Sequence, residues 1–509
     1  MSLPKIRLSV VICAVFAVSS ASAWGVVYVA ADATGANNGT SWADAYTDLQ
    51  TALANTSAGD IWVKAGTYKP GTTRTNSFVM KNNVALYGGF AGAENPATFD
   101  LANRDLVANE TILSGDIGTI GDNSDNCYHV FYHPDGTNLD STAILDGFTI
   151  SGGNADDGNY PHGYGGGMYN YGNSPKLTNC MFIANLASSY GGGMCNWSSS
   201  NPTLINCTFN GNSGGIGGGG MFNYSSSNPT LANCTFSGNS AQSGGGMFNW
   251  SSSSPTLTHC TFTVNSASGG SGMYNYYNSN PTLTNCILWG NSGVQMCEDL
   301  SSAAVSYSCI QGSWEGYGNV NADPLFVRNP DPGLDGSWGT ADDDYGDLHL
   351  QNGSPCINAG DPNGDYTGQT DMDDEVRVQQ CRVDIGVDET PYIGLDCNSN
   401  GTADACEASL DSDGVPDECD VCPNTVPGSP VDQNGCPPMI PGDYDHDGDV
   451  DVSDLADFEW CASGPAIPYT GDCSKADFDN DNDVDVSDFG VFQRCLSGED
   501  NPAHPDCVD

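Results

Sequence analysis

The chain has 509 residues, with 63 acidic against 13 basic side chains and a formal net charge of −50 at pH 7. A surface this acidic repels nucleic acid and anionic membranes, so neither is an expected partner. It attracts cations, and the spacing of the acidic residues decides whether they bind metal or serve only solubility.

The first 23 residues have the pattern of a secretory signal peptide. Lys5 and Arg7 precede an apolar run over residues 8–18, and small residues lead up to a cleavage site after Ala23. The run is too short to cross a bilayer, and no later segment is long enough. We therefore expect residues 1–23 to be removed and the remainder to be secreted, where disulfides can form.

Residues 24–107 contain strand and loop patterns without a repeat. Residues 60–63 and 84–90 have strand patterns, and residues 41–54 have the pattern of one short helix. Because a stack of repeats needs its first apolar surface covered, this region is expected to cap the stack.

Five consecutive segments then repeat one motif at intervals of 26 or 27 residues. Each contains Gly-Met-x-Asn, followed by Pro-x-Leu and by Asn-Cys-x-Phe or a close variant. A fixed period in this range, with short apolar runs and no helical spacing, indicates a solenoid whose coils bury their apolar faces by stacking. The Gly-Met-x-Asn motifs lie at residues 167–170, 193–196, 220–223, 246–249 and 272–275.

An asparagine stands between the inward Leu and Cys positions of the repeat. Leu204, Cys207 and Phe209 cannot all point inward along one straight strand, so the chain needs a bend there. Asn tolerates the left-handed backbone that resets the alternation. Coils lie roughly 4.8 Å apart, which suits hydrogen-bonded side-chain ladders. The corner residues are Asn179, Asn206, Asn233 and Asn285, with His259 as the departure.

The cysteines fall into two classes. Of the 21 in the chain, Cys13 lies in the expected signal peptide, which leaves an even number. A column at one repeat position would place thiols somewhat too far apart for disulfides, and a straight column does not converge on a metal. Buried free thiols are therefore expected at Cys180, Cys207, Cys234, Cys260 and Cys286, continued by Cys309.

An aromatic column accompanies the repeats. If exposed, such a strip could bind a glycan or a protein. Rings at coil spacing can also stack on one another, and self-stacking is the favoured interpretation. The column consists of Tyr171, Trp197, Tyr224, Trp250 and Tyr276.

From residue 321 the repeat gives way to short motifs at residues 323–326, 347–351, 354–360 and 382–386. Together they resemble the closing segment of secreted right-handed parallel β-helix proteins of the pectate-lyase-like superfamily. The resemblance covers residues 24–390, with regular coils over about 163–295. It implies a mainly β fold and says almost nothing about activity.

The solenoid contains no recognisable catalytic motif, so its catalytic residues are unknown. Between Gly163 and Ser313 the only basic residue is Lys176, which argues against a lyase acting on polyuronates. The ordered motifs of polygalacturonases are absent. The two carboxylates of an inverting glycosidase could come only from irregular loops, where turns or calcium binding are the favoured roles. These loops contain Asp116, Asp122, Asp125, Asp146, Asp156 and Asp157, near His129, His133 and His162.

The acidic tail carries the strongest chemical signal. Residues 443–454 place carboxylates at the first, third, fifth, ninth and twelfth positions of a loop, with Gly448 at the sixth position, where a sharp turn is required. This spacing wraps oxygen ligands around one Ca²⁺ ion. The pattern returns 34 residues later with Asn482 in the glycine position. The predicted ligands are Asp443, Asp445, Asp447, Asp451 and Asp454, then Asp477, Asp479, Asp481, Asp485 and Asp488, with backbone carbonyls from Asp449 and Asp483.

Each loop precedes a short amphipathic helix, and the pair resembles a type I dockerin over residues 439–509. The twelfth-position aspartate and the tandem duplication both fit that family. The resemblance implies a cohesin-like or other extracellular protein partner, chosen partly by the tenth and eleventh loop positions. These are Val452-Ser453 and Val486-Ser487, whose near identity suggests two equivalent docking orientations.

The tail cysteines repeat with the loops. Cys461 and Cys473 recur 34 residues later as Cys495 and Cys507. One bridge within each repeat is the simplest pairing. Two bridges between the repeats, Cys461 with Cys495 and Cys473 with Cys507, are the alternative.

Residues 391–438 form a Cys- and Asp-rich spacer that is similar to thrombospondin type 3 calcium repeats. Because the spacer is too small for an apolar core, bound ions and disulfides would have to hold its shape. A weaker version of the same acidic pattern at residues 333–344 indicates a further calcium loop. The candidate ligands of the spacer are Asp396, Asn398, Asn400, Asp404, Asp411, Asp413 and Asp417.

The sequence thus predicts a secreted modular protein with Ca²⁺ as its cofactor. Its right-handed parallel β-helix would bind a polysaccharide or cell-surface glycan, and the small α-helical dockerin-like domain would tether it to an extracellular partner. The alternative is a carbohydrate-active enzyme, a polysaccharide hydrolase or lyase, delivered by its dockerin.

Overall fold

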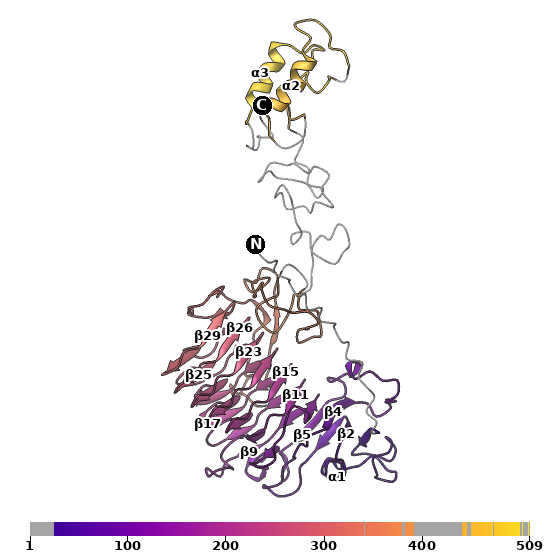
Figure 1. Ribbon diagram of the computed structural model, residues 1–509, viewed down its shortest axis with the longest axis vertical. Helices are drawn as coiled ribbons and strands as arrows, with labels where there is room; N and C mark the ends of the chain where they lie inside the picture. Colours follow the sequence, from indigo (N-terminus) through magenta and orange to yellow (C-terminus); the bar gives the residue numbers. More distant parts are fainter. Residues whose placement is uncertain are drawn as a thin grey trace, which may run out of the picture. The chain divides into compact units, whose positions relative to one another are not determined.

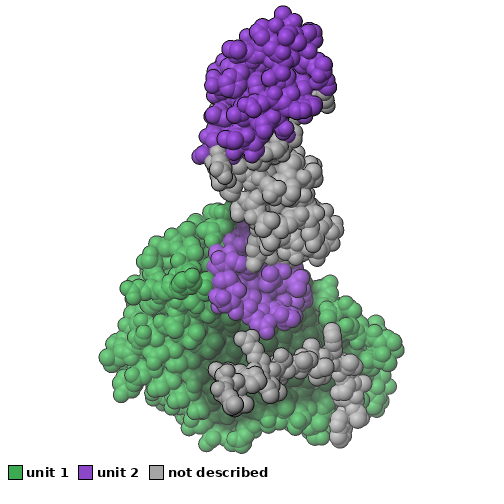
Figure 2. All heavy atoms as spheres, turned by 45° about the horizontal axis from the view of Figure 1, so that its top comes forward, with its two compact units in different colours: residues 1–356, 385–388 green, residues 357–384, 389–509 purple. Residues whose placement is uncertain are grey.

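The computed structural model describes residues 25–340, 342–378, 382–390, 440–444, 449–471, 473–498, 501 and 507. One compact unit consists of residues 1–356 and 385–388, and the other of residues 357–384 and 389–509 (Figure 2). The expected signal peptide and the expected spacer lie outside the described residues. Within the described ranges, no helix combines the length and the apolar character that a bilayer-spanning segment requires.

The first unit is a stack of short parallel strands wound into coils (Figure 1). Successive coils pair in register, so that Met168 lies beside Met194 and Leu177 beside Leu204. The register follows from the repeat, because a constant spacing places like residues next to one another. The predicted mainly β fold, a parallel β-helix, is confirmed.

Four parallel sheets run along the stack, and one antiparallel pair follows them. The first contains β1 (Val27–Val29), β2 (Gly59–Lys64), β4 (Val84–Phe90), β7 (Ile144–Asp146), β11 (Lys176–Thr178), β15 (Thr203–Ile205), β19 (Thr230–Ala232), β23 (Thr256–Thr258), β26 (Thr282–Thr284) and β29 (Ala304–Ser306). The second contains β6 (Phe131–His133), β10 (Met168–Tyr171), β14 (Met194–Trp197), β18 (Met221–Tyr224), β22 (Met247–Trp250), β25 (Met273–Tyr276) and β28 (Met296–Asp299).

The third contains β3 (Gly66–Tyr68), β5 (Thr111–Ser114), β8 (Thr149–Ser151), β12 (Met181–Ile183), β16 (Thr208–Asn210), β20 (Thr235–Ser237), β24 (Thr261–Thr263), β27 (Ile287–Trp289) and β30 (Cys309–Ile310). The fourth contains β9 (Asn154–Ala155), β13 (Leu186–Ala187), β17 (Ser213–Gly217) and β21 (Ser240–Ser243). The antiparallel pair is β31 (Phe326–Arg328) with β32 (Asp347–Leu350).

The predicted N-terminal helix is α1 (Leu49–Asn55), which begins later than expected. The carboxylate of Asp48 accepts the backbone N–H of Thr51 at 2.9 Å and so caps the first turn. Leu49 and Leu53 are buried in the same apolar cluster as the first strands, so α1 covers that end of the core. Two short 3-10 helices, η1 (Leu101–Asn103) and η2 (Asn123–Asp125), complete this region.

The bends between strands are left-handed, as predicted. Asn233 donates a hydrogen bond from its amide to Oδ1 of Asn206 at 3.0 Å, and the Asn285 amide lies 2.9 Å from Nε2 of His259. The corner prediction is therefore confirmed, including its histidine variant. The φ angles are 52° at Asn179, Asn206 and Asn233, 55° at Asn285 and 51° at His259.

The interior of the stack is filled by columns of identical residues. Four phenylalanine rings stack with centroids 4.5–4.7 Å apart and planes within 4° of parallel. The predicted cysteine column is buried and contains no disulfide, which confirms the free thiols. The stacked rings are those of Phe182, Phe209, Phe236 and Phe262, and the thiols are those of Cys180, Cys207, Cys234, Cys260, Cys286 and Cys309.

Two buried ladders of asparagine amides also run along the stack, and neither was predicted. Each amide except the last of each ladder donates to Oδ1 of the asparagine one coil further on, at 2.8–2.9 Å in the first ladder and 2.8–3.1 Å in the second. The asparagine of Gly-Met-x-Asn was the available signal for the first ladder. The ladders consist of Asn170, Asn196, Asn223, Asn249 and Asn275, and of Asn185, Asn212, Asn239, Asn265 and Asn291.

The C-terminal part of the second unit is built on two helices, α2 (Val452–Cys461) and α3 (Val486–Cys495), drawn in yellow in Figure 1. Their inward rings meet, with 5.1 Å between the centroids of Phe458 and Phe492. The buried residues of this core are Ile440, Val450, Phe458, Ala476, Val484, Phe492 and Cys495.

Candidate metal centre

Each predicted calcium loop runs directly into a helix that its own aspartates cap. Asp451 accepts the backbone N–H of Ser453 at 2.7 Å, and Asp485 accepts that of Ser487 at 2.7 Å. An aspartate at this position satisfies a free N–H group and interacts favourably with the helix dipole. The ninth position of each loop is thereby fixed against the start of a helix.

The aspartate at the twelfth position closes each loop on itself. One oxygen of Asp488 accepts the N–H of Phe478 at 2.7 Å and the other accepts the N–H of Asp485 at 2.8 Å. Asp454 does the same in the first loop, with the N–H groups of Tyr444 at 2.6 Å and Asp451 at 2.9 Å. Each of these carboxylates therefore holds the beginning and the end of its loop together.

The loops bring carboxylate oxygens into three groups. Within each group, one oxygen from each residue lies within 4.8 Å of the others. Oxygens gathered at this distance from several loop positions are the ligands that Ca²⁺ takes. The groups are Asp449 with Asp451 and Asp454, Asp477 with Asp479 and Asp488, and Asp483 with Asp485 and Asp488.

Crowded carboxylates change one another's acidity. Desolvation raises the pKa of Asp479 and of Asp483, and neighbouring carboxylates, including that of Asp481, raise both further. A like charge disfavours ionisation, whereas a cation among the oxygens would favour it. The loops thus concentrate negative charge where a cation would be bound.

One oxygen in the second loop has no protein partner. Oδ2 of Asp483 accepts the backbone N–H of Ala466, whereas Oδ1 is buried without a hydrogen-bond partner. Such an oxygen is costly to bury unless a cation or a proton satisfies it. The donor set of this loop therefore fits a hard divalent cation, and Ca²⁺ would be held by carboxylate and carbonyl oxygens.

The sharp turn of the second loop has the predicted backbone. Asn482 has φ 72°, and Asn480 before it has φ 58°. Asp477 holds the turn by accepting the N–H groups of Asp481 at 3.1 Å and Asn482 at 3.0 Å. Asn482, which stands where the sequence of the first loop has a glycine, therefore has the left-handed backbone expected of it.

Most of the predicted ligands in the described part of the tail lie in these groups. Asp443 is buried at the start of the first loop, and Asp481 is exposed and accepts the N–H of Asp483 at 3.1 Å. Asp449 and Asp483 were expected to offer only backbone carbonyls, but their side-chain oxygens also join the groups. The predictions for Asp445, Asp447, Asp396, Asn398, Asn400, Asp404, Asp411, Asp413 and Asp417 lie outside the described residues.

A disulfide closes each of the two repeats. Cys461 is bonded to Cys473 and Cys495 to Cys507, each across 12 residues. The pairing within repeats is confirmed, and the alternative pairing between repeats is wrong. Each bridge anchors the last residue of a helix to the segment that follows it.

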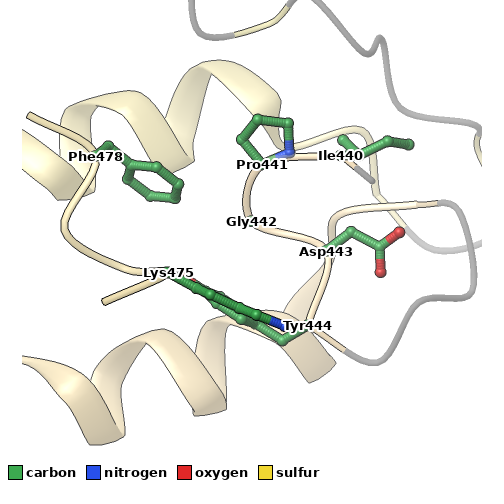
Figure 3. Close-up of a pocket in the computed structure, with 7 residues that line it drawn as sticks. All are labelled: Ile440, Pro441, Gly442, Asp443, Tyr444, Lys475 and Phe478. Carbon is green, nitrogen blue, oxygen red and sulfur yellow. The ribbon is translucent and has the colours of Figure 1, made fainter. Parts of the chain in front are cut away.

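A pocket of about 320 Å³ lies beside the first loop (Figure 3). Tyr444 and Phe478, which hold the second position of the two loops, both line it. The pocket therefore lies where the two repeats face each other. Its lining residues are Ile440, Pro441, Gly442, Asp443, Tyr444, Lys475 and Phe478.

The carboxylates in the irregular β-helix loops have structural contacts. Asp146 forms an ion pair with Arg104 at 2.8 Å, and Asp156 forms one with Arg74 at 2.7 Å. These contacts agree with the interpretation of the loops as turns. The remaining four, Asp116, Asp122, Asp125 and Asp157, accept hydrogen bonds from groups of their own loops.

The carboxylates of the acidic loop at residues 333–344 also take part in hydrogen bonds and an ion pair. Asp342 accepts the N–H of Leu334 at 2.7 Å, and Asp344 forms an ion pair with Arg328 at 2.6 Å. Among the described residues of this loop, no three ligand groups come together. The calcium loop expected here gains no support.

The comparisons with known proteins bear on the fold. Residues 107–254 and 138–310 match the sequence model of a family described as "Right handed beta helix region". No curated protein sequence matches the chain.

Three solved structures are similar at low identity. Pectate lyase Pel9A is 15% identical with a TM-score of 0.40, and the match covers 73% of this chain and 97% of that one. A pectin methylesterase from Aspergillus niger is 16% identical with a TM-score of 0.25, over 55% of this chain and 85% of that one. The tailspike protein gp49 of Acinetobacter baumannii bacteriophage Fri1, a capsular polysaccharide depolymerase, is 12% identical with a TM-score of 0.24, over 58% and 61%. The parallel coils of this chain form a right-handed parallel β-helix.

Proposed function

We propose that this chain is a secreted, calcium-dependent modular protein. Its tandem loops bind Ca²⁺ and form a plug for a cohesin-like extracellular partner, while its β-helix presents a surface to polysaccharide or a cell-surface glycan. The single observation that carries the proposal is the convergence of aspartate oxygens in both loops, each ahead of a capped helix.

Two exposed valines support the docking role. Val452 and Val486, at the tenth position of their loops, are 77% and 78% exposed. Ser453 and Ser487 beside them are exposed too. Two equivalent patches of this kind would allow a partner to bind in two orientations related by the internal repeat.

The spacer would extend the calcium dependence. Residues 391–438 are proposed to bind further ions through the aspartates and asparagines named above, as their similarity to thrombospondin type 3 repeats implies. The enzyme alternative stays a prediction. The six loop carboxylates that it would use take part in turns and ion pairs, and Oδ1 of Asp116 and of Asp125 is buried without a hydrogen-bond partner.

Calorimetric titration of the mature chain with Ca²⁺ tests the proposal. Asp454→Asn and Asp488→Asn should each remove about one equivalent of bound Ca²⁺, because each loses the carboxylate that closes its loop. Asp457→Asn, an exposed aspartate of α2 outside the loops, is the matched control and should leave the stoichiometry unchanged. An absence of heat with the unsubstituted chain would refute the proposal.

Docking is tested on type I cohesin modules by surface plasmon resonance. Val452→Asp alone and Val486→Asp alone should each preserve binding, since the other patch remains. The double substitution should abolish it. If either single substitution abolished cohesin binding as completely as the double substitution, the two docking orientations would be contradicted.

A further inference from the structure

The outward face of the seven-stranded sheet carries an aromatic ring at the last position of each of five successive strands, β10, β14, β18, β22 and β25. The rings are paired in register from coil to coil, and all are half-buried. Four coil steps of roughly 4.8 Å give this column a length of about 19 Å. We call it the aromatic strip: Tyr171, Trp197, Tyr224, Trp250 and Tyr276. A second column lies two positions earlier on the same face and is more deeply buried at Tyr169, Phe222 and Phe248.

Four of the five rings, from Trp197 to Tyr276, contact one another along the strip but do not stack flat. The planes of Trp197 and Tyr224 meet at 53°, those of Tyr224 and Trp250 at 72°, and those of Trp250 and Tyr276 at 56°, with centroids 4.4–5.8 Å apart. The phenylalanines inside the stack are parallel to within 4°. Tilted contacts cover less of a ring face than parallel stacking does, and the five rings are half-buried rather than buried.

Tyrosines continue the aromatic surface at the N-terminal end of the strip. Trp197 contacts Tyr160 and Tyr164, with ring centroids 5.8 and 5.4 Å away. The hydroxyl of Tyr169 donates to that of Tyr160 at 3.0 Å, and Tyr160 is 56% exposed. A polar hydroxyl is thus presented beside the first tryptophan.

A pair of histidines lies beside the same tyrosines. His129 is buried, and its Nδ1 lies 2.9 Å from the carbonyl oxygen of Gly165, which can only accept a hydrogen bond. Burial lowers the pKa of His129 to about 3, so its ring is neutral and its Nε2 bears a lone pair. Nδ1 of His162, 3.1 Å from that Nε2, must therefore donate.

The tautomer of His162 follows from this chain of bonds. When Nδ1 carries the proton, Nε2 of His162 is an acceptor, and this ring is only half-buried. Tyr128 stacks on it at 4.5 Å, and the Arg74 guanidinium lies over Tyr128 at 4.3 Å. Arg74 is held by its ion pair with Asp156, so it remains in the protein framework.

The charge of the surroundings limits what the strip can bind. Between Gly163 and Ser313 the only basic residue is Lys176, and the chain has a formal charge of −50. In the same range the only acidic residues are Glu298 and Asp299, so the coils themselves are nearly uncharged. Polyuronates and anionic membranes therefore find almost no basic partner there, and the net charge of the chain disfavours them. A neutral polymer is not disfavoured, and the C–H faces of its sugar rings can pack on exposed aromatic faces.

We propose that the aromatic strip binds a linear neutral glycan, and that His162 and Tyr160 bind sugar hydroxyl groups at its N-terminal end. This inference rests on the proposed glycan-binding role of the β-helix. It names the class of ligand and the place of binding. Trp197 and Trp250 are the main contact residues, and His129 is a positioning residue that sets the tautomer of His162.

The test uses the whole mature chain in affinity electrophoresis. The neutral probes are hydroxyethylcellulose, xyloglucan, galactomannan and laminarin, and the anionic probes are polygalacturonate and alginate. At least one neutral probe should retard the chain, and neither anionic probe should. Trp250→Ala should weaken the retardation at least tenfold, whereas Trp460→Ala, which removes a 74% exposed tryptophan from α2, should not change it.

His162 is tested with two substitutions of different shape. In His162→Asn the amide nitrogen takes the place of Nδ1 and can still donate to His129, but the Nε2 acceptor is lost. In His162→Gln an amide group can replace Nε2. Asparagine should weaken glycan binding more than glutamine, with circular dichroism unchanged in both.

The outcomes separate this inference from the proposed function. Failure of every neutral probe to bind, or equal retardation by polygalacturonate, overturns the inference. If Ca²⁺ uptake by the same preparation is intact, the calcium-dependent docking role is unaffected by that failure. Binding that survives Trp250→Ala and Trp197→Ala together would place the glycan elsewhere and would also overturn it.

Discussion

The backbone N–H of Val450 donates to the hydroxyl of Ser497 at 3.0 Å, and the N–H of Ser497 returns a bond of 2.9 Å to the Val450 carbonyl. The equivalent bonds 34 residues away join Val484 to Ser463 at 2.9 and 3.0 Å. Each loop is therefore tied, at its eighth position, to the segment that follows the helix of the other repeat. Neither loop can reorganise alone.

Ser497→Ala should weaken Ca²⁺ binding in the first loop, although Ser497 belongs to the second repeat. The substitution leaves the buried N–H of Val450 without its partner, which costs about 1–3 kcal/mol. In an Asp488→Asn background, which disables the second loop, calorimetry should show the remaining affinity falling about tenfold. In an Asp454→Asn background, which disables the first loop, Ser497→Ala should have little effect on the remaining affinity. The control Ser474→Ala, at an exposed serine, should have little effect in either background. Equal effects in both backgrounds would contradict the cross-tie.

Removing either disulfide should destabilise the C-terminal helices by a similar amount. Both bridges close loops with a separation of 12 residues, and a loop of this length is worth about 3 kcal/mol of unfolded-state entropy. Cys461→Ser with Cys473→Ser, and Cys495→Ser with Cys507→Ser, should therefore show equal losses in thermal unfolding of the Ca²⁺-loaded chain. A large difference between the two pairs would show that local contacts, rather than loop closure, dominate.

The first asparagine ladder should be more sensitive in its middle than at its end. Asn223 accepts from Asn196 at 2.9 Å and donates to Asn249 at 2.8 Å, so Asn223→Ala leaves two buried amide groups without partners. At the last rung, Nδ2 of Asn275 is buried without a hydrogen-bond partner. Asn275→Ala thus removes one bond from the ladder. Denaturant unfolding of the β-helix should show a loss about 1–3 kcal/mol larger for Asn223→Ala.

Acid should destabilise the β-helix below about pH 6.5. Burial lowers the pKa of His129 to about 3 and that of His133 to about 4. Since the unfolded chain protonates these imidazoles near their ordinary pKa of about 6.5, it binds more protons than the folded chain, and stability falls as the pH drops from 7 towards 4.

His133→Asn isolates one of these protons. The amide can still donate to Asn170, but it does not titrate. Between pH 6 and pH 5 the variant should lose about 1.2 kcal/mol less stability than the unsubstituted chain. Unfolding in urea at fixed pH values measures the difference. Parallel pH profiles would show that His133 is already protonated in the folded state.

The β-helix could be predicted from the sequence because each repeat places the same type of residue at the same position of the coil. A constant interval fixes the register, and the left-handed Asn179 and His259 correspond to the bends that the Leu, Cys and Phe spacing requires. The same argument identified the free cysteine column. The ladder of Asn170 was missed because its direction depends on which side of β10 faces inward, and that side is decided by packing in three dimensions.

The calcium loops were predictable in position but not in full detail. Spacing alone indicated the twelfth-position aspartates and the turn at Asn482. It did not indicate that the side chain of Asp483 turns inward, because that depends on the N–H of Ala466, which comes from the segment after the other helix. The aromatic strip likewise required the tilt of Trp250, which no spacing encodes.

The hydrogen bonds of the first ladder all point the same way. The N–H of Met80 donates to His133, His133 donates to Asn170, and each amide from Asn170 to Asn249 donates to the asparagine of the next coil. Each interior asparagine therefore accepts a hydrogen bond from the coil before it and donates one to the coil after it. All interior coils thus make the same pair of ladder bonds. A duplication or deletion of one complete repeat would join like ends and leave the ladder continuous, so a scaffold built in this way can change its length by whole coils.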